Sequence, residues 1–434
     1  IGGPDPEDDG DLVFLSTQTL DGTGEIVFAR PGDPFSAVLR NTGTLTIGPG
    51  ILIHGGSGYM NMSTVVNQGV IRSDVPGELI YLGGTMWSNE NELSVLNGST
   101  LQLASTFTFD GGGFFDGTDG TILLTGTIDL EGSTLELTES TGPLTLSNGW
   151  IRDGSLMYSD GDLLDLSRSG RLINMTLQSD LTIDDGDTLE ISNGLTLDNV
   201  TITIGGPDPE DDGDLVFLST QTLDGTGEIV FARPGDPFSA VLRNTGTLTI
   251  GPGILIHGGS GYMNMSTVVN QGVIRSDVPG ELIYLGGTMW SNENELSVLN
   301  GSTLQLASTF TFDGGGFFDG TDGTILLTGT IDLEGSTLEL TESTGPLTLS
   351  NGWIRDGSLM YSDGDLLDLS RSGRLINMTL QSDLTIDDGD TLEISNGLTL
   401  DNVTITIGGP DPEDDGDLVF LSTQTLDGTG EIVF

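Results

Sequence analysis

The sequence contains no cysteine, no lysine and only two histidines among its 434 residues. Without cysteine, a disulfide framework and a thiolate metal site are excluded. No run of 18 apolar residues occurs, so no membrane-spanning helix is expected. The 12 basic residues are all arginine, against 65 aspartates and glutamates, and the formal net charge is −53. Because phosphate binding needs clustered basic side chains, this charge argues against a nucleic-acid partner and against anionic membrane surfaces.

What the sequence does contain is an exact tandem repeat. Residues 1–203 recur without a difference as residues 204–406, and residues 407–434 repeat the first 28 residues once more. Each complete repeat carries 29 acidic residues and six arginines, a net charge of about −23. No Ser/Pro-rich spacer separates the copies, so we expect one continuous structure cut from a longer array.

The repeat has the pattern of short β-strands. Helix signals are scarce, and apolar residues alternate with polar ones in segments such as residues 44–47, 100–103 and 134–137. This period of two is typical of strands with one buried face. Turn dipeptides such as Asp-Gly and Asn-Gly separate the segments at intervals of about eight to twelve residues. The pattern predicts an all-β fold, a parallel β-helix (β-solenoid) in one continuous rod, with coils of about 20 to 25 residues.

Two segments carry a resemblance to known proteins. Asn-Thr-Gly-Thr-Leu-Thr-Ile at residues 41–47 and Val-Asn-Gln-Gly-Val-Ile at residues 66–71 resemble the coils of large bacterial extracellular β-helix proteins. These include filamentous haemagglutinin-type adhesins, autotransporter passengers and the giant repeat proteins of planctomycete-like bacteria. The resemblance implies a right-handed helix, export to the cell surface and a role as fibre or adhesin. It brings no active-site motif.

The acidic segment at the start of each repeat has two interpretations. Alternating acidic residues followed by glycine are similar to the start of a calcium loop, in which carboxylate oxygens surround the ion. Glu7 and Ser16 depart from the EF-hand pattern, and these departures favour the second interpretation, a solvated acidic loop. Two shorter acidic turns, at residues 160–165 and 184–187, are weaker candidates. The candidate Ca²⁺ ligands are Asp5, Glu7, Asp9, Asp11, Asp208, Glu210, Asp212 and Asp214.

The remaining candidate residues favour structure over catalysis. His54, the single histidine of the repeat, has no evident serine or cysteine partner and is interpreted as a surface or turn residue. Four sequons per repeat fit either glycan sites or internal asparagine ladders. The aromatic residues fit either a carbohydrate-stacking patch or caps over the coil interior. The sequons are Asn61, Asn97, Asn174 and Asn199, and the aromatics are Trp87, Phe107, Phe109, Phe114, Phe115 and Trp150.

Together these features predict a non-catalytic structural fibre or adhesin stalk outside the cell. Its partners would be neighbouring copies of the fibre, cell-surface components or glycans, and it would need no cofactor unless the acidic loops take up Ca²⁺. The alternative is a carbohydrate-binding or carbohydrate-active β-helix of a cell surface or phage fibre. That alternative predicts a groove in which carboxylates and aromatics converge.

Overall fold

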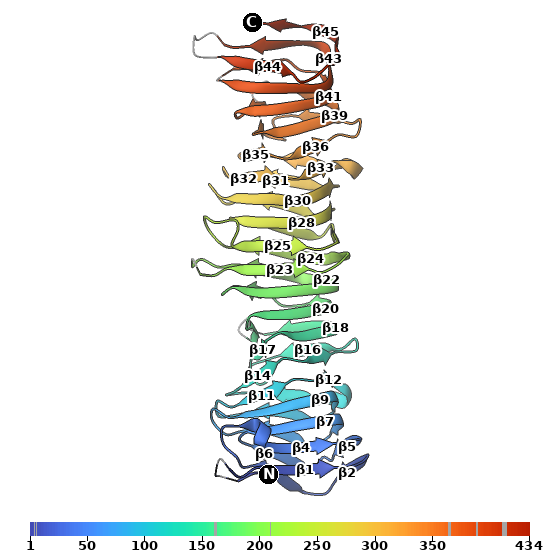
Figure 1. Ribbon diagram of the computed structural model, residues 1–434, viewed down its shortest axis with the longest axis vertical. Coiled ribbons are helices and arrows are strands. Elements are labelled where there is room, and N and C mark those ends of the chain that lie inside the picture. Colours follow the sequence, from blue (N-terminus) through green and yellow to red (C-terminus); the bar gives the residue numbers. More distant parts are fainter. Residues whose placement is uncertain are drawn as a thin grey trace. The chain divides into compact units, whose positions relative to one another are not determined.

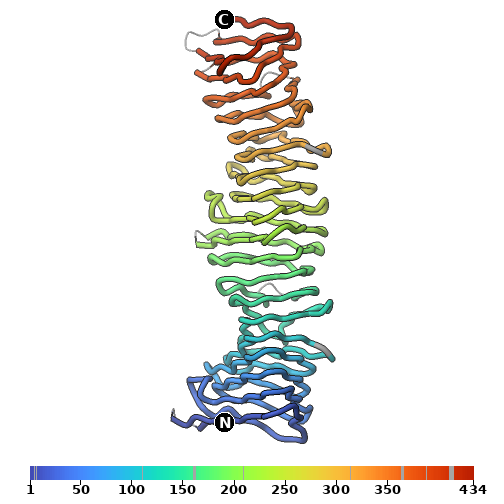
Figure 2. Tube along the Cα trace, turned by 45° about the vertical axis from the view of Figure 1, so that its right-hand side comes forward, coloured from blue at the N-terminus to red at the C-terminus, as the bar shows by residue number. Residues whose placement is uncertain are grey.

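The computed structural model describes the whole chain except Pro4, Pro6, residues 160–162, Pro209, residues 363–365, Asp388 and residues 410–414. It contains two compact units, Ile1–Val200 and Thr201–Phe434. Each unit is a parallel β-solenoid. Within each unit the coils stack one upon the next (Figures 1 and 2). The all-β solenoid expected from the strand pattern is confirmed.

The strands of the first unit fall into three columns, each a parallel ladder along one face. The first column contains β1 (Gly10–Phe14), β4 (Ala37–Asn41), β11 (Thr100–Leu103), β14 (Thr121–Leu124), β17 (Leu144–Leu146) and β19 (Leu164–Leu166). The second contains β2 (Gln18–Leu20), β5 (Thr44–Ile47), β12 (Thr106–Thr108) and β15 (Thr127–Asp129). The third contains β3 (Gly24–Phe28), β6 (Ile51–Gly55), β8 (Val70–Ser73), β10 (Glu92–Val95), β13 (Phe114–Asp116) and β16 (Thr134–Leu137).

Longer strands bend from one column into the next. In the first unit β7 (Gly58–Asn67) and β9 (Leu79–Asn89) join the first two columns, and β18 (Gly149–Tyr158), β20 (Ser169–Leu177) and β22 (Asp187–Ile204) join the second and third. The short strand β21 (Leu181–Ile183) follows β20. The described residues of this unit also form two 3-10 turns, η1 (Pro34–Ser36) and η2 (Asp110–Gly112).

The second unit repeats this order. Its strands are β23 (Gly213–Phe217), β24 (Gln221–Phe231), β25 (Ala240–Asn244), β26 (Thr247–Ile250), β27 (Ile254–Gly258), β28 (Gly261–Asn270), β29 (Val273–Ser276), β30 (Leu282–Asn292), β31 (Glu295–Val298), β32 (Thr303–Leu306), β33 (Thr309–Thr311), β34 (Phe317–Asp319), β35 (Thr324–Leu327), β36 (Thr330–Asp332), β37 (Thr337–Leu340), β38 (Leu347–Leu349), β39 (Gly352–Tyr361), β40 (Leu367–Leu369), β41 (Ser372–Leu380), β42 (Leu384–Ile386), β43 (Asp390–Ile407), β44 (Gly416–Phe420) and β45 (Leu426–Val433), with the 3-10 turn η4 (Asp313–Gly315).

The core follows from the period-two alternation. In β5 the side chains of Leu45 and Ile47 are fully buried, while the threonines between them are half-buried. Parallel register places each buried residue above another: Leu45 pairs with Val65, which pairs with Trp87. Trp87 stacks on Phe107 with ring centroids 5.6 Å apart. Stacking therefore turns small apolar faces into a continuous core column, as repeat proteins require.

Coil length varies more than the sequence suggested. Paired residues on successive coils are separated by 18 residues from Leu52 to Val70, by 27 from Gly10 to Ala37 and by as many as 28 from Leu398 to Leu426. The coil from Gly10 to Ala37 contains a proline-rich loop, in which Asp33 accepts a hydrogen bond from the backbone N of Phe35 at the start of η1.

In the second unit a strand crosses the boundary between repeats. β43 (Asp390–Ile407) runs through residue 406, the last of the second copy, to Ile407, the first of the third. It forms ladders with β41 on one side and with β44 and β45 of the third copy on the other. At this boundary the two copies are therefore joined within a single strand.

The same ladders show that the third copy begins on a different face from the second. From Gln221 in the second column, nine successive pairings lead to Phe420. Phe420 is the copy of Phe217, which belongs to the first column. Likewise Leu426, the copy of a second-column residue, pairs with Leu398 of the third column. One repeat therefore makes nine coils and one additional face.

Candidate functional sites

The acidic segment forms a loop before the first strand of each complete repeat. In the first copy the backbone N of Asp8 donates to the carbonyl of Asp5 (3.0 Å), and the backbone N of Asp9 donates to that of Glu7 (3.1 Å). Arg30 forms an ion pair with Asp9, and Arg40 forms one with Asp11. In the second copy Asp212 and Asp214 are paired in the same way, with Arg233 and Arg243.

Asp9, Asp11, Asp212 and Asp214 therefore each contact an arginine. Within the ranges that the structure describes, no group of three or more His, Asp or Glu side chains is placed to hold a metal ion. The copy of the loop at Asp411 and the acidic turn at residues 160–162 lie outside the described residues. Calcium binding by the acidic loop therefore stays a prediction from its sequence pattern.

The second acidic turn has a structural role. Asp187 is buried, and its Oδ1 accepts a hydrogen bond from the backbone N of Arg168 on the preceding coil (2.7 Å). Burial raises the pKa of Asp187, the bond from Arg168 lowers it, and the carboxylates of Asp165, Asp184 and Asp185 raise it further. The turn therefore joins two coils at the cost of placing a charge among other acids.

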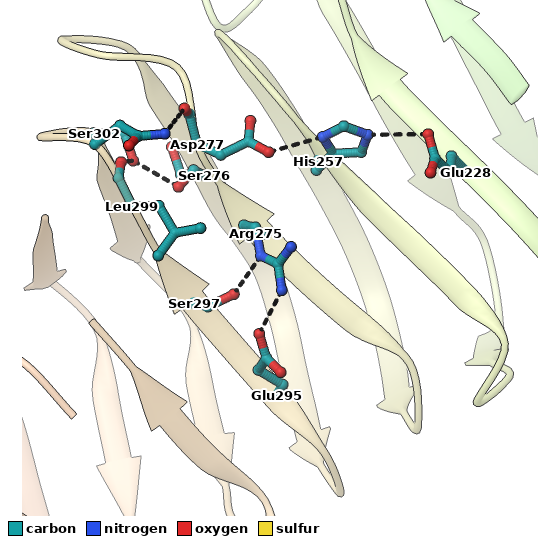
Figure 3. Close-up of polar contacts among 10 residues, drawn as sticks. Glu228, His257, Arg275, Ser276, Asp277, Glu295, Ser297, Leu299 and Ser302 are labelled. Atoms are coloured by element: carbon teal, nitrogen blue, oxygen red, sulfur yellow. Dashed lines mark hydrogen bonds and ion pairs between the residues drawn. The ribbon is translucent and has the colours of Figure 1, made fainter. Parts of the chain in front are cut away.

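The histidine lies on the third face between two carboxylates, as Figure 3 shows for the second unit. Nδ1 of His257 is 2.9 Å from Asp277, and Nε2 is 3.4 Å from Glu228. His54 has the same contacts, with Asp74 and Glu25. His54 lies in strand β6 and not in a turn, which corrects one half of the expectation. Because both ring nitrogens contact acids, neither is directed at a nucleophile, and the geometry suits a bridge between coils.

Below this histidine an arginine makes a second bridge. Arg275 donates to Ser297 (3.2 Å) and Glu295 (3.0 Å) on the next strand of the column (Figure 3). Five of the six arginines of the first repeat make such pairs, about one coil apart along the chain. The pairs missed by sequence reasoning are Arg30–Asp9, Arg40–Asp11, Arg72–Glu92, Arg152–Asp129 and Arg171–Glu190.

Asparagines form an internal ladder, but not at the sequons. Nδ2 of the buried Asn67 donates to Oδ1 of the buried Asn89 on the next coil (2.7 Å), and Asn270 and Asn292 repeat this bond. The four sequon asparagines of the first repeat are exposed, and three of them, Asn97, Asn174 and Asn199, have a positive φ. An internal asparagine ladder therefore exists, but the sequon asparagines do not form it, so the ladder interpretation was wrong for these residues.

The aromatic residues divide between core and surface. Trp87, Phe107 and Phe115 are buried, which confirms the interpretation as core residues for these three. Phe114 and Trp150 are 46% and 42% exposed, and the guanidinium of Arg171 lies 4.9 Å above the Trp150 ring.

A cluster that sequence reasoning missed contains Phe35, Tyr59 and Tyr81. Their ring centroids lie 5.1 to 5.6 Å apart, and Phe35 is 57% exposed. Tyr59 and Tyr81 pair in the ladder of the first column. The coil length that brings them together was not readable from the sequence.

The third column is interrupted once in each repeat. In the described pairings β13 has a ladder partner only in β10, and β16 only in β18. A cavity of about 310 Å³, here called the notch, opens between them and is lined by Phe109, Phe114, Phe115, Leu130, Glu131, Leu135 and Glu136 among others. The second repeat has the same notch between β34 and β37, with a volume of about 270 Å³.

No known protein family, no curated protein and no solved structure matches this chain. No helix among the described residues is long and apolar enough to span a membrane.

Proposed function

We propose that this chain is a segment of an extracellular structural fibre, a stalk or adhesin shaft, without catalytic activity. The observation that carries the proposal is strand β43 (Asp390–Ile407), which continues from one identical copy into the next with its ladders intact. Adding such copies lengthens a fibre without any new kind of contact between them. In most arrays of independent domains, by contrast, flexible linkers separate the domains.

The contacts between coils suit a load-bearing role. Backbone ladders run along three faces, and the core column beneath them is fully buried from Leu45 to Ile191. Five arginine–carboxylate pairs and the Asn67–Asn89 bond join neighbouring coils in the first repeat. Local unfolding must break several of these contacts at once, which supports stiffness and resistance to proteolysis.

The charge supports the same role. Each repeat retains about −23 charges after its six arginines are counted. Such a surface keeps fibres soluble and separated at low ionic strength, and screening by salt weakens the repulsion. Extracellular placement rests on the resemblance of residues 41–47 and 66–71 to bacterial surface β-helices.

Electron microscopy of arrays with different repeat numbers tests the proposal. At about 4.8 Å per coil, each repeat should add about 45 Å to a stiff rod. Uniform rods whose length rises linearly with repeat number are the expected result. Beads joined by flexible strings would overturn it.

The alternative, a carbohydrate-binding β-helix, is favoured by the exposed aromatic cluster of Phe35, Tyr59 and Tyr81. Binding on a glycan array that disappears in Phe35→Ala/Phe238→Ala would establish this alternative. Rods without glycan binding would leave the fibre as the better account.

The calcium prediction for the acidic loop has a separate test. If Asp5, Glu7, Asp9 and Asp11 bind Ca²⁺ in the folded state, millimolar Ca²⁺ should raise the Tm and EDTA should reverse the rise. A Tm that responds to neither would leave Asp9 and Asp11 as partners of arginine alone.

A further inference from the structure

The notch is built by a local sequence that the fibre role does not require. Phe109 and Phe115 flank Asp-Gly-Gly-Gly-Phe at residues 110–114. Gly111 and Gly112 have φ angles of +69° and +93° and carry the chain out of the strand path at η2. A plain coil turn would have allowed β13 and β16 to pair as their neighbours in the other two columns do. The interruption occurs at the same residues of both repeats.

The floor of the notch is aromatic and aliphatic. Phe109 and Phe115 meet edge to face with centroids 4.9 Å apart, and Phe114 beside them is 46% exposed. Leu130 and Leu135 complete the apolar lining. The volume lies at the lower end of ligand pockets, roughly 300–1,000 Å³, and therefore fits one side chain or a molecule of that size.

The rim of the notch is acidic. Glu131 and Glu136 belong to the lining, as does Asp129, whose carboxylate is paired with Arg152, and no arginine or histidine lines the cavity. Glu131 has a φ of +49°, a conformation that L-residues other than asparagine and glycine rarely adopt, and Glu334 repeats it. A strained acidic residue at the mouth of a cavity is the kind of position that often carries function.

The charge of this lining determines which ligands the notch can bind. Its side chains offer carboxylates, hydroxyls and aromatic faces, and none carries a positive charge. An anionic ligand would be repelled. A neutral sugar can stack on the rings and donate its hydroxyls to the carboxylates, but it gains nothing from their negative charge. A cation with an apolar stem gains from the carboxylates and from the ring faces together.

We propose that the notch of each repeat binds an organic cation with an apolar stem: the arginine or lysine side chain of a basic partner protein. Five of the six arginines in the repeat already pair with the chain's own carboxylates. Two copies of this chain, each with about −23 charges per repeat, repel one another, so the partner is a different, basic protein and not a second copy. Binding of this kind would attach a basic protein to the fibre once per repeat.

The experiment uses the full chain and two probes. Saturation-transfer NMR and titration measure binding of the peptide acetyl-Gly-Arg-Gly-amide and of free n-butylguanidinium at low salt. The matched control is the same peptide with citrulline, which keeps the shape and lacks the charge. We expect the arginine peptide to bind at least about tenfold more tightly than the citrulline peptide. Equal affinities would overturn the proposal. Binding of butylguanidinium but not of the peptide would contradict a partner protein and would indicate a free organic cation as the ligand.

Variants in both repeats locate the binding. Phe114→Ala/Phe317→Ala should abolish it, while Phe35→Ala/Phe238→Ala, which removes exposed phenylalanines outside the notch, should not. Glu131→Gly/Glu334→Gly provides a variant that relieves backbone strain, so it should fold at least as well and still lose several-fold in affinity. Unchanged affinity in this glycine variant, with its fold intact, would overturn the proposal. Rod formation should be normal in all of them, so failure here leaves the fibre role untouched.

Discussion

Tyr158 shows how the solenoid constrains a single polar group. Its side chain is 6% exposed, and its hydroxyl donates to the carbonyl of Asp180 on the next coil. Burial raises the pKa of Tyr158, and the nearby Asp180 carboxylate raises it further. Tyr361 has the same contacts and the same shift in the second unit. The folded state therefore holds this phenolic proton more tightly than the unfolded chain does.

This shift predicts a loss of stability in alkali. Above pH 10, the ordinary pKa of tyrosine, the unfolded chain loses the proton while the folded state keeps it. Stability is thus fully present below pH 10 and falls as the pH rises further, by at most about 1.4 kcal/mol per pH unit for each tyrosine. Since the chain has no lysine or cysteine, few other groups titrate in this range.

The comparison is between wild type and Tyr158→Phe/Tyr361→Phe in urea denaturation from pH 7 to 11. At pH 7 the variant should be less stable by about 1 kcal/mol per site, because each lost hydroxyl leaves a carbonyl without its donor. Above pH 10 the gap should close and then reverse. Parallel pH profiles for the two proteins would contradict the assignment to these tyrosines.

Composition predicted much about single residues but not their partners. The sequence shows a large excess of acids over arginines, but it did not predict that the arginines would pair with carboxylates. Which carboxylate depends on coil length, because Arg72 meets Glu92 after 20 residues and Arg40 meets Asp11 across 29. Coil length depends on the lengths of the loops, and the alternation of apolar and polar residues in the strands gives no information on them. For the same reason the carboxylates beside His54 could not be found from the sequence.

At the scale of elements, glycines mark the corners where long strands bend. Gly84 lies in β9 between the part that pairs in the first column and the part that pairs in the second. Its φ is +112°, and a Cβ atom there would lie 1.6 Å from the carbonyl O of Met62 on the preceding coil. Only glycine fits where the two backbones approach so closely.

Gly84→Ala should therefore lower the free energy of unfolding by well over ~1 kcal/mol, the usual scale for glycine replacements at unfavourable φ. Each kcal/mol would lower the Tm of a unit of this size by about 2–4 °C. Gly24→Ala is the matched control, because Gly24 is in strand β3, has an ordinary φ and would bring its new Cβ atom within 4 Å of no other atom. A Tm drop of equal size in both variants would contradict the steric account.

The existence of the strands was predictable, but their continuity was not. Residues 44–47, 100–103 and 134–137 are strands with the expected alternating burial. The 10 residues of β7 pair with two different strands across a corner, and alternation alone does not distinguish one bent strand from two. The notch could not be predicted from the sequence either, because the glycines at residues 111–113 do not differ in the sequence from those of an ordinary turn.

At the scale of the molecule, one repeat does not contain a whole number of coils. In the second unit one repeat covers nine coils and one further face, so the third copy starts one column away from the second. Surface features such as the notch would return on a new face with each copy of an array. After three repeats they would return to the face where they began. An array of this kind presents its sites around the fibre and not along one side.

Site-specific labelling of a longer array tests this register. The chain has no cysteine, so Asn61→Cys in every repeat creates one reactive thiol per copy at an exposed strand position. Maleimide-gold particles on the rods should appear about 45 Å apart along the axis and advance by one face per repeat in tomograms. Labelling every third repeat should instead place the particles in a single row. Particles in a single row with every repeat labelled would show that each repeat makes a whole number of coils, contrary to the ladder from Gln221 to Phe420.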